Sequence, residues 1–331
     1  MAANLGSALP SPPADGVSNL RFSLSSDLLL APSWDGTVRL YDAVQSRLCE
    51  SYLHKVPVLD ATFQDDHNIF TAGLNGAVKR YNFFGRVDSE IGSHDQPVRC
   101  IEWLSQRGLI ATGSWDGTLR LWDPRLRPGQ NGVGYIVLPG KVFSMAQTGT
   151  RLIVATSARR VQIYDLRNIE SGRAEQARES SLRFQTRTVR GFPNGTGYAL
   201  SSVEGRVAME YFDMGEAAQA KKYAFKCHRR VEDGKDTVYP VNAIAFHPLY
   251  GTFATGGCDG VINIWDGENK KRLSQIPGYP NGIAALAFSR DGSHLAAAAS
   301  YTYERGEQEH PADSIFVRAM ADAEVKPKPR K

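Results

Sequence analysis

Residues 33–42 read SWDGTVRLYD, and this stretch decides the fold because the chain repeats it. Close copies are SWDGTLRLWD at residues 114–123 and GCDGVINIWD at residues 257–266, and weaker copies cover residues 73–82, 157–165 and 202–211. The turn residues of the six copies follow one another at intervals of 40, 41, 42, 46 and 55 positions: Gly36, Gly76, Gly117, Arg159, Gly205 and Gly260. This period is typical of one blade of a WD-type propeller.

Each copy lies among predicted strands. Alternating apolar and polar residues precede it at 98–103 and 241–246, and a period of two buries one face of a strand. The Asp-Gly or Asn-Gly pair inside the copy favours a tight hairpin because these residues tolerate positive φ. A seventh unit is readable at residues 283–288, 294–300 and 314–318, with the polar stretch 301–313 in place of its middle turn. Since one four-stranded sheet cannot bury both of its faces, we predict an all-β, single-domain, seven-bladed WD-repeat β-propeller.

The two ends of the chain differ from the repeats in composition. Residues 1–14 are small, polar and proline-bearing, without the basic start and apolar core of a signal peptide, so we expect a disordered leader. The propeller is expected over residues 15–320. A basic C-terminal tail follows at 321–331, and its end, residues 326–331, reads either as a weak nuclear-import signal or as a solvated tail. N-terminal residues usually close such a ring by pairing with the last blade, and residues 14–20 are the candidates.

The overall charge argues against nucleic acid as the main partner. Lys and Arg number 39 against 35 Asp and Glu, a net charge of +4, which is too small for an electrostatic footprint. No apolar stretch approaches the roughly 18 residues of a membrane span. The four cysteines are scattered without a short Cys-x-x-Cys spacing, which favours neither a disulfide framework nor a zinc site. We expect no cofactor, no metal and no membrane partner.

Two sets of residues have the spacing of the hydrogen-bonded tetrad that braces WD-type blades. The first set is His94, Ser114 or Thr112, Asp116 and Trp122, and the second is His228, Thr255, Asp259 and Trp265. Two copies in one ring indicate architecture rather than a catalytic triad. A phosphate-binding glycine loop and a nucleophile elbow are absent from the sequence. We therefore predict a non-enzymatic protein; the competing hypothesis, a propeller enzyme, would show unpaired carboxylates at the channel mouth.

Two tryptophans stand at a turn position where a small or polar residue would suffice. Trp34 and Trp115 directly precede the turn aspartates, on the face where the turns and the loops entering the blades are expected to meet. A partner covering about 150–200 Å² of such a ring would gain ~4–5 kcal/mol before ordering costs, the size of a binding hot spot. The alternative is that each indole packs on the loop of a neighbouring blade.

Arginines take the next turn position in two adjacent units. Arg160 and Arg206 stand where other units have Thr37, Thr118 and Val261. Guanidinium groups bind carboxylates in a two-pronged fashion, so an acidic peptide over the indoles could be held there. The alternative, weighed equally, is a local salt bridge, for instance between Arg206 and Glu204. A further basic group, which includes His228, Arg229 and Arg230, lies in the loop that enters the sixth unit.

Beyond the blade pattern, the chain resembles a known family, the spindle-assembly-checkpoint WD-repeat proteins called "budding uninhibited by benzimidazole", third member. This family is related to the messenger-RNA export factor of the nuclear pore. The motifs that carry the resemblance are WDPR at 122–125, RRV at 159–161, YDLRN at 164–168, RESSL at 178–182, VEGRVA at 203–208, YAFKCHR at 223–229 and NKKRL at 269–273.

The resemblance implies a kinetochore adaptor in the nucleus, a monomeric propeller within hetero-complexes. Its top face would bind the GLEBS motif of checkpoint kinases and kinase-like partners, and it would also bind phosphorylated Met-Glu-Leu-Thr repeats of the kinetochore scaffold. The family's binding tryptophan matches Trp34, its strand-start arginine matches Arg206 and its phosphate-contacting arginine matches Arg229. Trp115 and Arg160 are added from the blade pattern alone. The alternative function is nuclear-pore mRNA export through the GLEBS motif of a nucleoporin.

Overall fold

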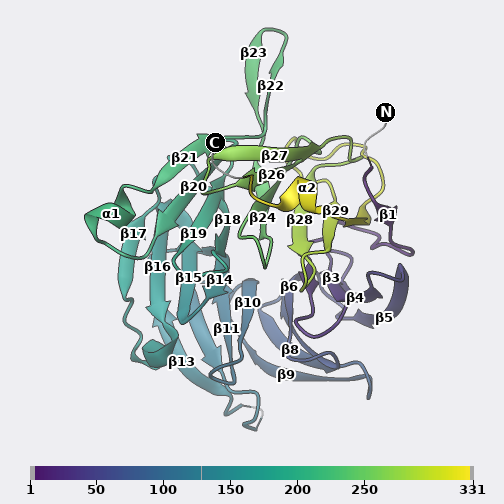
Figure 1. The fold of residues 1–331 in the computed structure, drawn as a ribbon. Helices are drawn as coiled ribbons and strands as arrows, with labels where there is room; N and C mark the ends of the chain where they lie inside the picture. Colours follow the sequence, from purple (N-terminus) through teal and green to yellow (C-terminus); the bar gives the residue numbers. More distant parts are fainter. Residues whose placement is uncertain (1–3, 128, 329–331) are drawn as a thin grey trace.

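Seven four-stranded antiparallel sheets are arranged as blades around a central channel (Figure 1). The computed structural model describes residues 4–127 and 129–328. The first three blades contain β2 (Arg21–Phe22), β3 (Leu28–Pro32), β4 (Thr37–Asp42) and β5 (Arg47–Leu53); β6 (Val58–Phe63), β7 (Asn68–Gly73), β8 (Ala77–Asn82) and β9 (Val87–Ser93); and β10 (Val98–Leu104), β11 (Leu109–Ser114), β12 (Thr118–Trp122) and β13 (Gly132–Val137).

The remaining four blades keep the same order of strands. They contain β14 (Val142–Thr148), β15 (Arg151–Thr156), β16 (Arg160–Asp165) and β17 (Gln176–Glu179); β18 (Thr186–Gly191), β19 (Gly197–Ser202), β20 (Arg206–Tyr211) and β21 (Tyr223–Lys226); β24 (Val241–Phe246), β25 (Phe253–Gly257), β26 (Ile262–Asp266) and β27 (Lys271–Ile276); and β28 (Ile283–Phe288), β29 (His294–Ala299), β30 (Ser314–Ala319) and β1 (Ser7–Ala8). The predicted seven-bladed propeller is confirmed.

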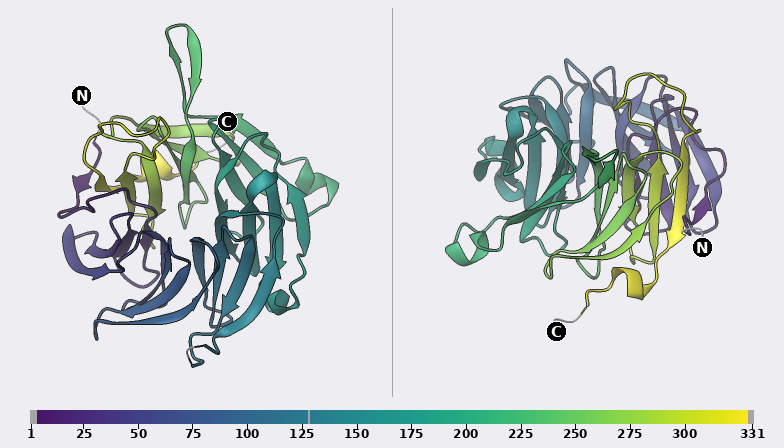
Figure 2. Two further views of the ribbon diagram at one scale, coloured as in Figure 1. Left: turned by 180° about the vertical axis from the view of Figure 1, so that it is seen from behind. Right: turned by 90° about the horizontal axis from the view of Figure 1, so that it is seen from above.

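Short elements decorate the ring. They are the 3-10 turns η1 (Ser157–Arg159) and η2 (Leu166–Ser171), the one-turn helices α1 (Glu216–Gln219) and α2 (Asp322–Val325), and the hairpin β22 (Arg229–Glu232) and β23 (Lys235–Val238). The hairpin extends outward from the ring, away from the channel (Figures 1 and 2). No helix in the described residues is long and apolar enough to cross a membrane.

One backbone hydrogen bond recurs in all seven blades. In each, the amide of the first turn residue after the second strand donates to a carbonyl of the loop that enters the same blade; the donor–acceptor pairs are Trp34–Gly16, Leu74–Pro57, Trp115–Pro97, Ser157–Lys141, Val203–Gln185, Cys258–Pro240 and Ser300–Gly282. These turns and entry loops therefore share one face of the ring, as expected. We call it the loop face and define it by these seven pairs.

The turn itself explains the repeated glycine. Gly76 has φ 85°, and a Cβ there would lie 2.4 Å from the carbonyl oxygen of His94, so no other residue fits without a shift. In the fourth blade Arg159 takes the same place with φ 60°. The alignment of Arg159 with the turn glycines is thus confirmed by its left-handed backbone.

Apolar faces of neighbouring blades pack against one another. Leu30 and Val38 of the first blade form one cluster with Val58 and Ile69 of the second, and all four are fully buried. The free energy gained by this burial offsets the conformational entropy lost when the strands become ordered, which a single isolated blade could not do. The ring is thereby rigid enough to position the loops on its face.

The two predicted tetrads are formed. His94 Nε2 and Trp122 Nε1 both lie 2.7 Å from the hydroxyl of Thr112, and His94 Nδ1 lies 3.0 Å from Asp116. Thr112 therefore supplies the hydroxyl, whereas Ser114 donates to backbone carbonyls of the entry loop. The second set, His228, Thr255, Asp259 and Trp265, repeats these contacts at 2.8–2.9 Å.

The expected disordered leader is wrong for the part of residues 1–14 that the structure describes. Ser7 pairs with Val317, so β1 is the fourth strand of the last blade, and Leu9 behind it is buried. The ring closes there rather than through pairing of residues 14–20 with that blade. Val17 instead bridges to Ser33 of the first blade. A strand of two residues is too short to show a period in sequence.

The C-terminal segment is anchored to the ring at Val325, whereas residues 326–328 are exposed. Val325 is buried, and its carbonyl accepts a 2.7 Å hydrogen bond from the hydroxyl of Thr252 in the sixth blade. Thr252 lies in the connection between β24 and β25, at the opposite end of the strands from the loop face; in side view α2, in yellow, lies at one end of the ring (Figure 2, right). The last three residues of the proposed import signal, 329–331, lie outside the described residues.

Candidate peptide-binding site

Trp34 stands in the turn between β3 and β4, on the loop face. Its amide is held by the 3.0 Å bond to Gly16, and the next residue, Asp35, accepts hydrogen bonds from Thr37 and Arg39. Burial acts to raise the pKa of Asp35, but these hydrogen bonds outweigh it and lower the pKa. The turn is therefore fixed, and yet the tryptophan remains 41% exposed.

Trp115 occupies the same position in the third blade, between β11 and β12. It is half-buried, whereas Trp34 is exposed. Both residues line one cavity of about 580 Å³ at the mouth of the central channel. The structure thus brings the two predicted tryptophans together, and the alternative of an indole sealed by a neighbouring loop does not describe Trp34.

Arg160 and Arg206 begin the third strands of adjacent blades, as aligned from the sequence. Arg160 has an exposed side chain with Nη1 3.9 Å from a carboxylate oxygen of Glu179. Arg206 is one-third exposed, and its Nε lies 3.5 Å from Glu204. The salt bridge weighed as an alternative for Arg206 is therefore present. Neither arginine lines the cavity beside Trp34, so the structure does not bring them into one cavity with the tryptophans.

Arg229 begins β22 at the base of the projecting hairpin. Its Nη1 donates to Asp236 on β23 at 2.6 Å, and its Nη2 donates to the backbone carbonyl of Glu204 at 3.3 Å. The side chain of Glu204 pairs with Arg206, so this one residue contacts both arginines. Asp236 is more than half exposed and can release Arg229 to an incoming anion without losing contact with water.

Sequence reasoning missed the residues that form the wall of the cavity. In every blade the second residue of the innermost segment faces the channel; these residues are Ser18, Leu59, Arg99, Phe143, Arg187, Asn242 and Ala284. In each blade the residue directly before it is a buried Val, Thr or Ile, such as Val17 in the first blade and Ile283 in the last. That recurring position was the available signal, because adjacent strand residues point to opposite sides. We call this set the channel ring.

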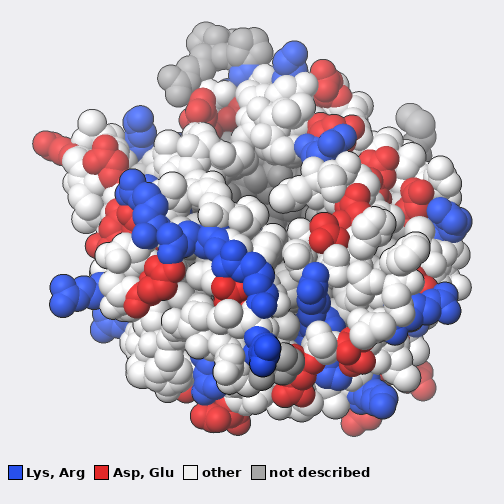
Figure 3. All heavy atoms as spheres, turned by 90° about the horizontal axis from the view of Figure 1, so that it is seen from below, with Lys and Arg blue, Asp and Glu red and all other residues white. Residues whose placement is uncertain are grey.

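The acidic side chains near the channel are already bound within the chain. Asp60 and Glu102 in the channel are paired with Arg21. In the described residues, no three His, Cys, Asp or Glu side chains are placed to hold a metal ion. On the side of the ring drawn in Figure 3, several Lys and Arg side chains form a continuous band, with Asp and Glu side chains beside it.

The blades, their tetrads and the recurring loop-face bonds define a WD-repeat β-propeller. The family model for the WD domain, G-beta repeat, matches residues 7–42, 85–123 and 224–266. The chain belongs to the Bub3 family of mitotic checkpoint proteins, which confirms the family resemblance, and its relatives support a role in the mitotic checkpoint.

The relatives match over nearly their whole length. The chain is 57% identical over 327 residues to "Mitotic checkpoint protein BUB3.1" of Arabidopsis thaliana, which covers 98% of this chain and 96% of the relative. It is 46% identical over 316 residues to "Mitotic checkpoint protein bub3" of Dictyostelium discoideum, covering 95% and 94%. A "Poly(A)+ RNA export protein" of Schizosaccharomyces pombe is 34% identical over 330 residues, covering 97% and 92%.

Proposed function

We propose that this protein is a non-enzymatic spindle-assembly-checkpoint adaptor that binds two kinds of peptide on its loop face. The first is the GLEBS motif of checkpoint kinases and kinase-like partners, bound by Trp34, Trp115, Arg160 and Arg206. The second is a phosphorylated Met-Glu-Leu-Thr repeat of the kinetochore scaffold, bound by Arg229. Checkpoint relatives imply work in protein complexes in the nucleus or at the kinetochore, and we place this propeller there as a monomer.

The observation that carries the first part is the exposure of Trp34 on a rigid turn beside a second tryptophan. Large exposed indoles at the rim of a concave site are typical anchors of peptide interfaces. Arg206 and Arg160, which do not line the cavity, supply cations for an acidic segment crossing from blade to blade. Each has an acidic partner of its own chain, so an incoming glutamate exchanges one ion pair for another.

Arg229 supports the second part through its present contacts. A phosphothreonine carries about −1.5 to −2 charges and three acceptor oxygens, whereas the Asp236 carboxylate that now holds Arg229 carries one negative charge. Replacing Asp236 as the partner of Arg229 is therefore favourable for a phosphothreonine and unfavourable for an unphosphorylated threonine. Phosphorylation thereby decides binding at this end of the face.

Fluorescence anisotropy with a labelled GLEBS peptide tests the first part. The wild-type propeller should bind the peptide, and a matched peptide with its glutamates changed to lysine should not bind. Equal binding of the two peptides would show that the cations of the loop face do not recognise acidic residues. Arg206→Glu should abolish binding while the melting temperature stays close to that of the wild type.

The alternative function, nuclear-pore mRNA export, is favoured by the 34% identity to the RNA export relative. A nucleoporin GLEBS peptide distinguishes the two, because an export factor should bind it more tightly than the kinase-type segment. The checkpoint function predicts the opposite order of affinities.

A further inference from the structure

The channel ring contains two arginines that the peptide-binding residues do not explain. Arg99 and Arg187 are the second residues of β10 and β18, and both line the 580 Å³ cavity together with Asn242. Arg190, three residues further along β18 and beyond a break in its register, lines a second cavity in the same channel. Three guanidinium groups thus converge on the axis of the propeller.

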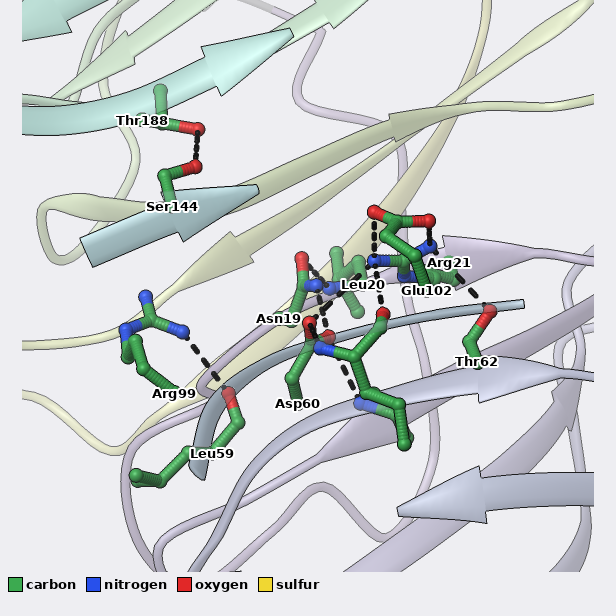
Figure 4. Close-up of polar contacts among 12 residues, drawn as sticks. Asn19, Leu20, Arg21, Leu59, Asp60, Thr62, Arg99, Glu102, Ser144 and Thr188 are labelled. Atoms are coloured by element: carbon green, nitrogen blue, oxygen red, sulfur yellow. Dashed lines mark hydrogen bonds and ion pairs between the residues drawn. The ribbon is translucent and has the colours of Figure 1, made fainter. Parts of the chain in front are cut away.

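A fourth arginine in the channel has the partners expected of a buried cation. Arg21 donates to both carboxylate oxygens of Glu102, at 2.7 and 2.8 Å, and lies 3.5 Å from Asp60. Figure 4 shows this cluster with Arg99 apart from it, directed at the backbone of Leu59. Arg21 is therefore neutralised by its own chain.

The other three arginines find only neutral oxygens. Arg99 donates to the carbonyl of Leu59 at 3.2 Å, Arg187 donates twice to the Asn242 side-chain oxygen, and Arg190 donates to the carbonyl of Val189. None of the three forms an ion pair within the part of the chain that the structure describes. A buried cation without a counterion is costly, and a cavity walled by protein strengthens its attraction for an anion.

The electrostatic setting agrees with that geometry. Burial lowers the pKa of Arg187 and the neighbouring charge of Arg99 lowers it too, whereas Cys258 and Glu304 act in the opposite direction without outweighing burial. Burial likewise lowers the pKa of Arg190, and Arg21 adds to the effect, although the carboxylates of Glu102 and Asp60 partly offset it. An anion in the channel would relieve the repulsion that both groups experience.

The cavity also offers neutral polar groups and aromatic walls. Gln185, Thr186, Asn242 and Thr302 contribute hydrogen-bonding groups, and Trp34, Trp115, Phe143, Tyr301 and Tyr303 contribute ring surfaces. Its volume lies in the range of small-ligand sites, which are about 300–1,000 Å³. Two carboxylates near the mouth are engaged locally: Asp15 accepts from the Gly16 amide, and Glu304 accepts from the Thr302 hydroxyl.

We propose that the mouth of the channel is an anion-binding site in which Arg99 and Arg187 together hold a group with carboxylate or phosphate oxygens. The planar guanidinium groups suit either kind of oxygen pair. The group comes either from a small phosphorylated molecule or from an acidic side chain of the segment lying across Trp34. This proposal depends only on the arginines without an ionic partner, so it does not require that the bound segment be a GLEBS motif.

Isothermal titration calorimetry with inorganic pyrophosphate tests the site directly in the full chain. We expect binding to the wild type and at least about tenfold weaker binding to Arg187→Gln and to Arg99→Gln, because each variant removes charge-assisted hydrogen bonds. Arg86→Gln is the matched control, since that arginine is three-quarters exposed in the turn before β9 and pairs with Glu50 on the outer strand β5, and it should bind as the wild type does. Circular dichroism melting confirms that each variant is folded.

The outcomes separate the sources of the anion. Pyrophosphate that binds and is displaced by a tetraglutamate peptide supports a carboxylate side chain as the occupant; pyrophosphate that binds and resists displacement supports a small phosphorylated ligand. No binding of either probe, or equal binding by the wild type and both channel variants, overturns the proposal. Arg206→Gln separates it from the proposed function, because Arg206 does not line the cavity; that variant should weaken GLEBS binding and keep pyrophosphate binding.

Discussion

Replacing Trp34 by alanine should weaken GLEBS binding by a size that follows from its exposure. A tryptophan buries at most about 250 Å², and Trp34 is 41% exposed, so a partner can cover roughly 100 Å² of it. At about 25 cal/mol per Å² this area contributes ~2.5 kcal/mol, which corresponds to about a 70-fold rise in Kd. The structure thus halves the 4–5 kcal/mol expected from sequence, because the rest of the indole is already covered.

The assay is calorimetric titration of the full chain with a GLEBS peptide at one salt concentration. Phe84→Ala is the matched control, since Phe84 is 90% exposed in the turn between β8 and β9, at the opposite end of its strand from the loop face. It should leave Kd unchanged. Phe84→Ala should melt as the wild type does, because its ring is exposed. Trp34→Ala should stay folded because the backbone bond from residue 34 to Gly16 remains, with only a small decrease in melting temperature from the covered part of the indole.

Two results would refute the reasoning about Trp34. A change in Kd of less than about threefold would mean that no partner covers the indole. A large drop in melting temperature would mean that Trp34 stabilises the fold, so that any loss of binding reflects unfolding.

Four further predictions concern the phosphate-binding residue, its internal partner, the tetrad and pH. Arg229→Ala should weaken a phosphorylated Met-Glu-Leu-Thr peptide by about tenfold or more and leave the unphosphorylated form unchanged; equal losses in calorimetry would remove the assigned role. Asp236→Asn should tighten the phosphorylated peptide because the carboxylate competes for Arg229 at 2.6 Å, and unchanged affinity would show that the ion pair opens freely. Thr112→Val leaves His94 and Trp122 without their shared hydroxyl and should cost roughly 2–5 kcal/mol in urea unfolding, against a loss under about 0.5 kcal/mol if the tetrad is dispensable. Burial lowers the pKa of His54 and of His94 from 6.5 to about 4. The free energy of unfolding should therefore be highest above pH 6.5 and decrease toward pH 4 by up to about 1.4 kcal/mol per pH unit for each histidine, because the unfolded chain binds protons that the folded chain does not. A free energy of unfolding that does not change between pH 6.5 and 4 would contradict neutral buried imidazoles.

The sequence predicts the blades well because each is specified locally. The turn at Gly36, its five further copies and the tetrad around His94 depend on residues close in sequence, so their spacing carries the information. Arg159 was aligned with the glycines by spacing alone, and its left-handed backbone confirms that alignment.

Long-range pairings leave no such local pattern. Ser7 and Ala8 complete the last blade only because the ring brings them beside β30, and Val325 is buried only because α2 folds back onto the sixth blade. Tertiary contacts thus overrode the polar, proline-bearing composition at these two places, whereas residues 326–328 remain exposed.

Only the part of the candidate site that lies in the repeated turns could be predicted from the sequence. The positions of Trp34, Trp115, Arg160 and Arg206 follow from the turn alignment. The ion-pair partners of the two arginines do not follow from that alignment, except for Glu204, which is two residues from Arg206. The channel ring was missed because its members differ in chemistry from blade to blade, and only the ring geometry brings Arg99 and Arg187 together.

Amide hydrogen exchange of the full chain, with and without a saturating GLEBS peptide, tests most directly whether the loop face binds it. We expect slower exchange in the loop-face turns at residues 33–37, 114–118 and 203–206, and unchanged exchange at the opposite end of the ring at residues 24–27 and 84–86. Slowing confined to the opposite end or to the outer strands, with the loop-face turns unaffected, would contradict a peptide-binding role for Trp34 and its neighbours.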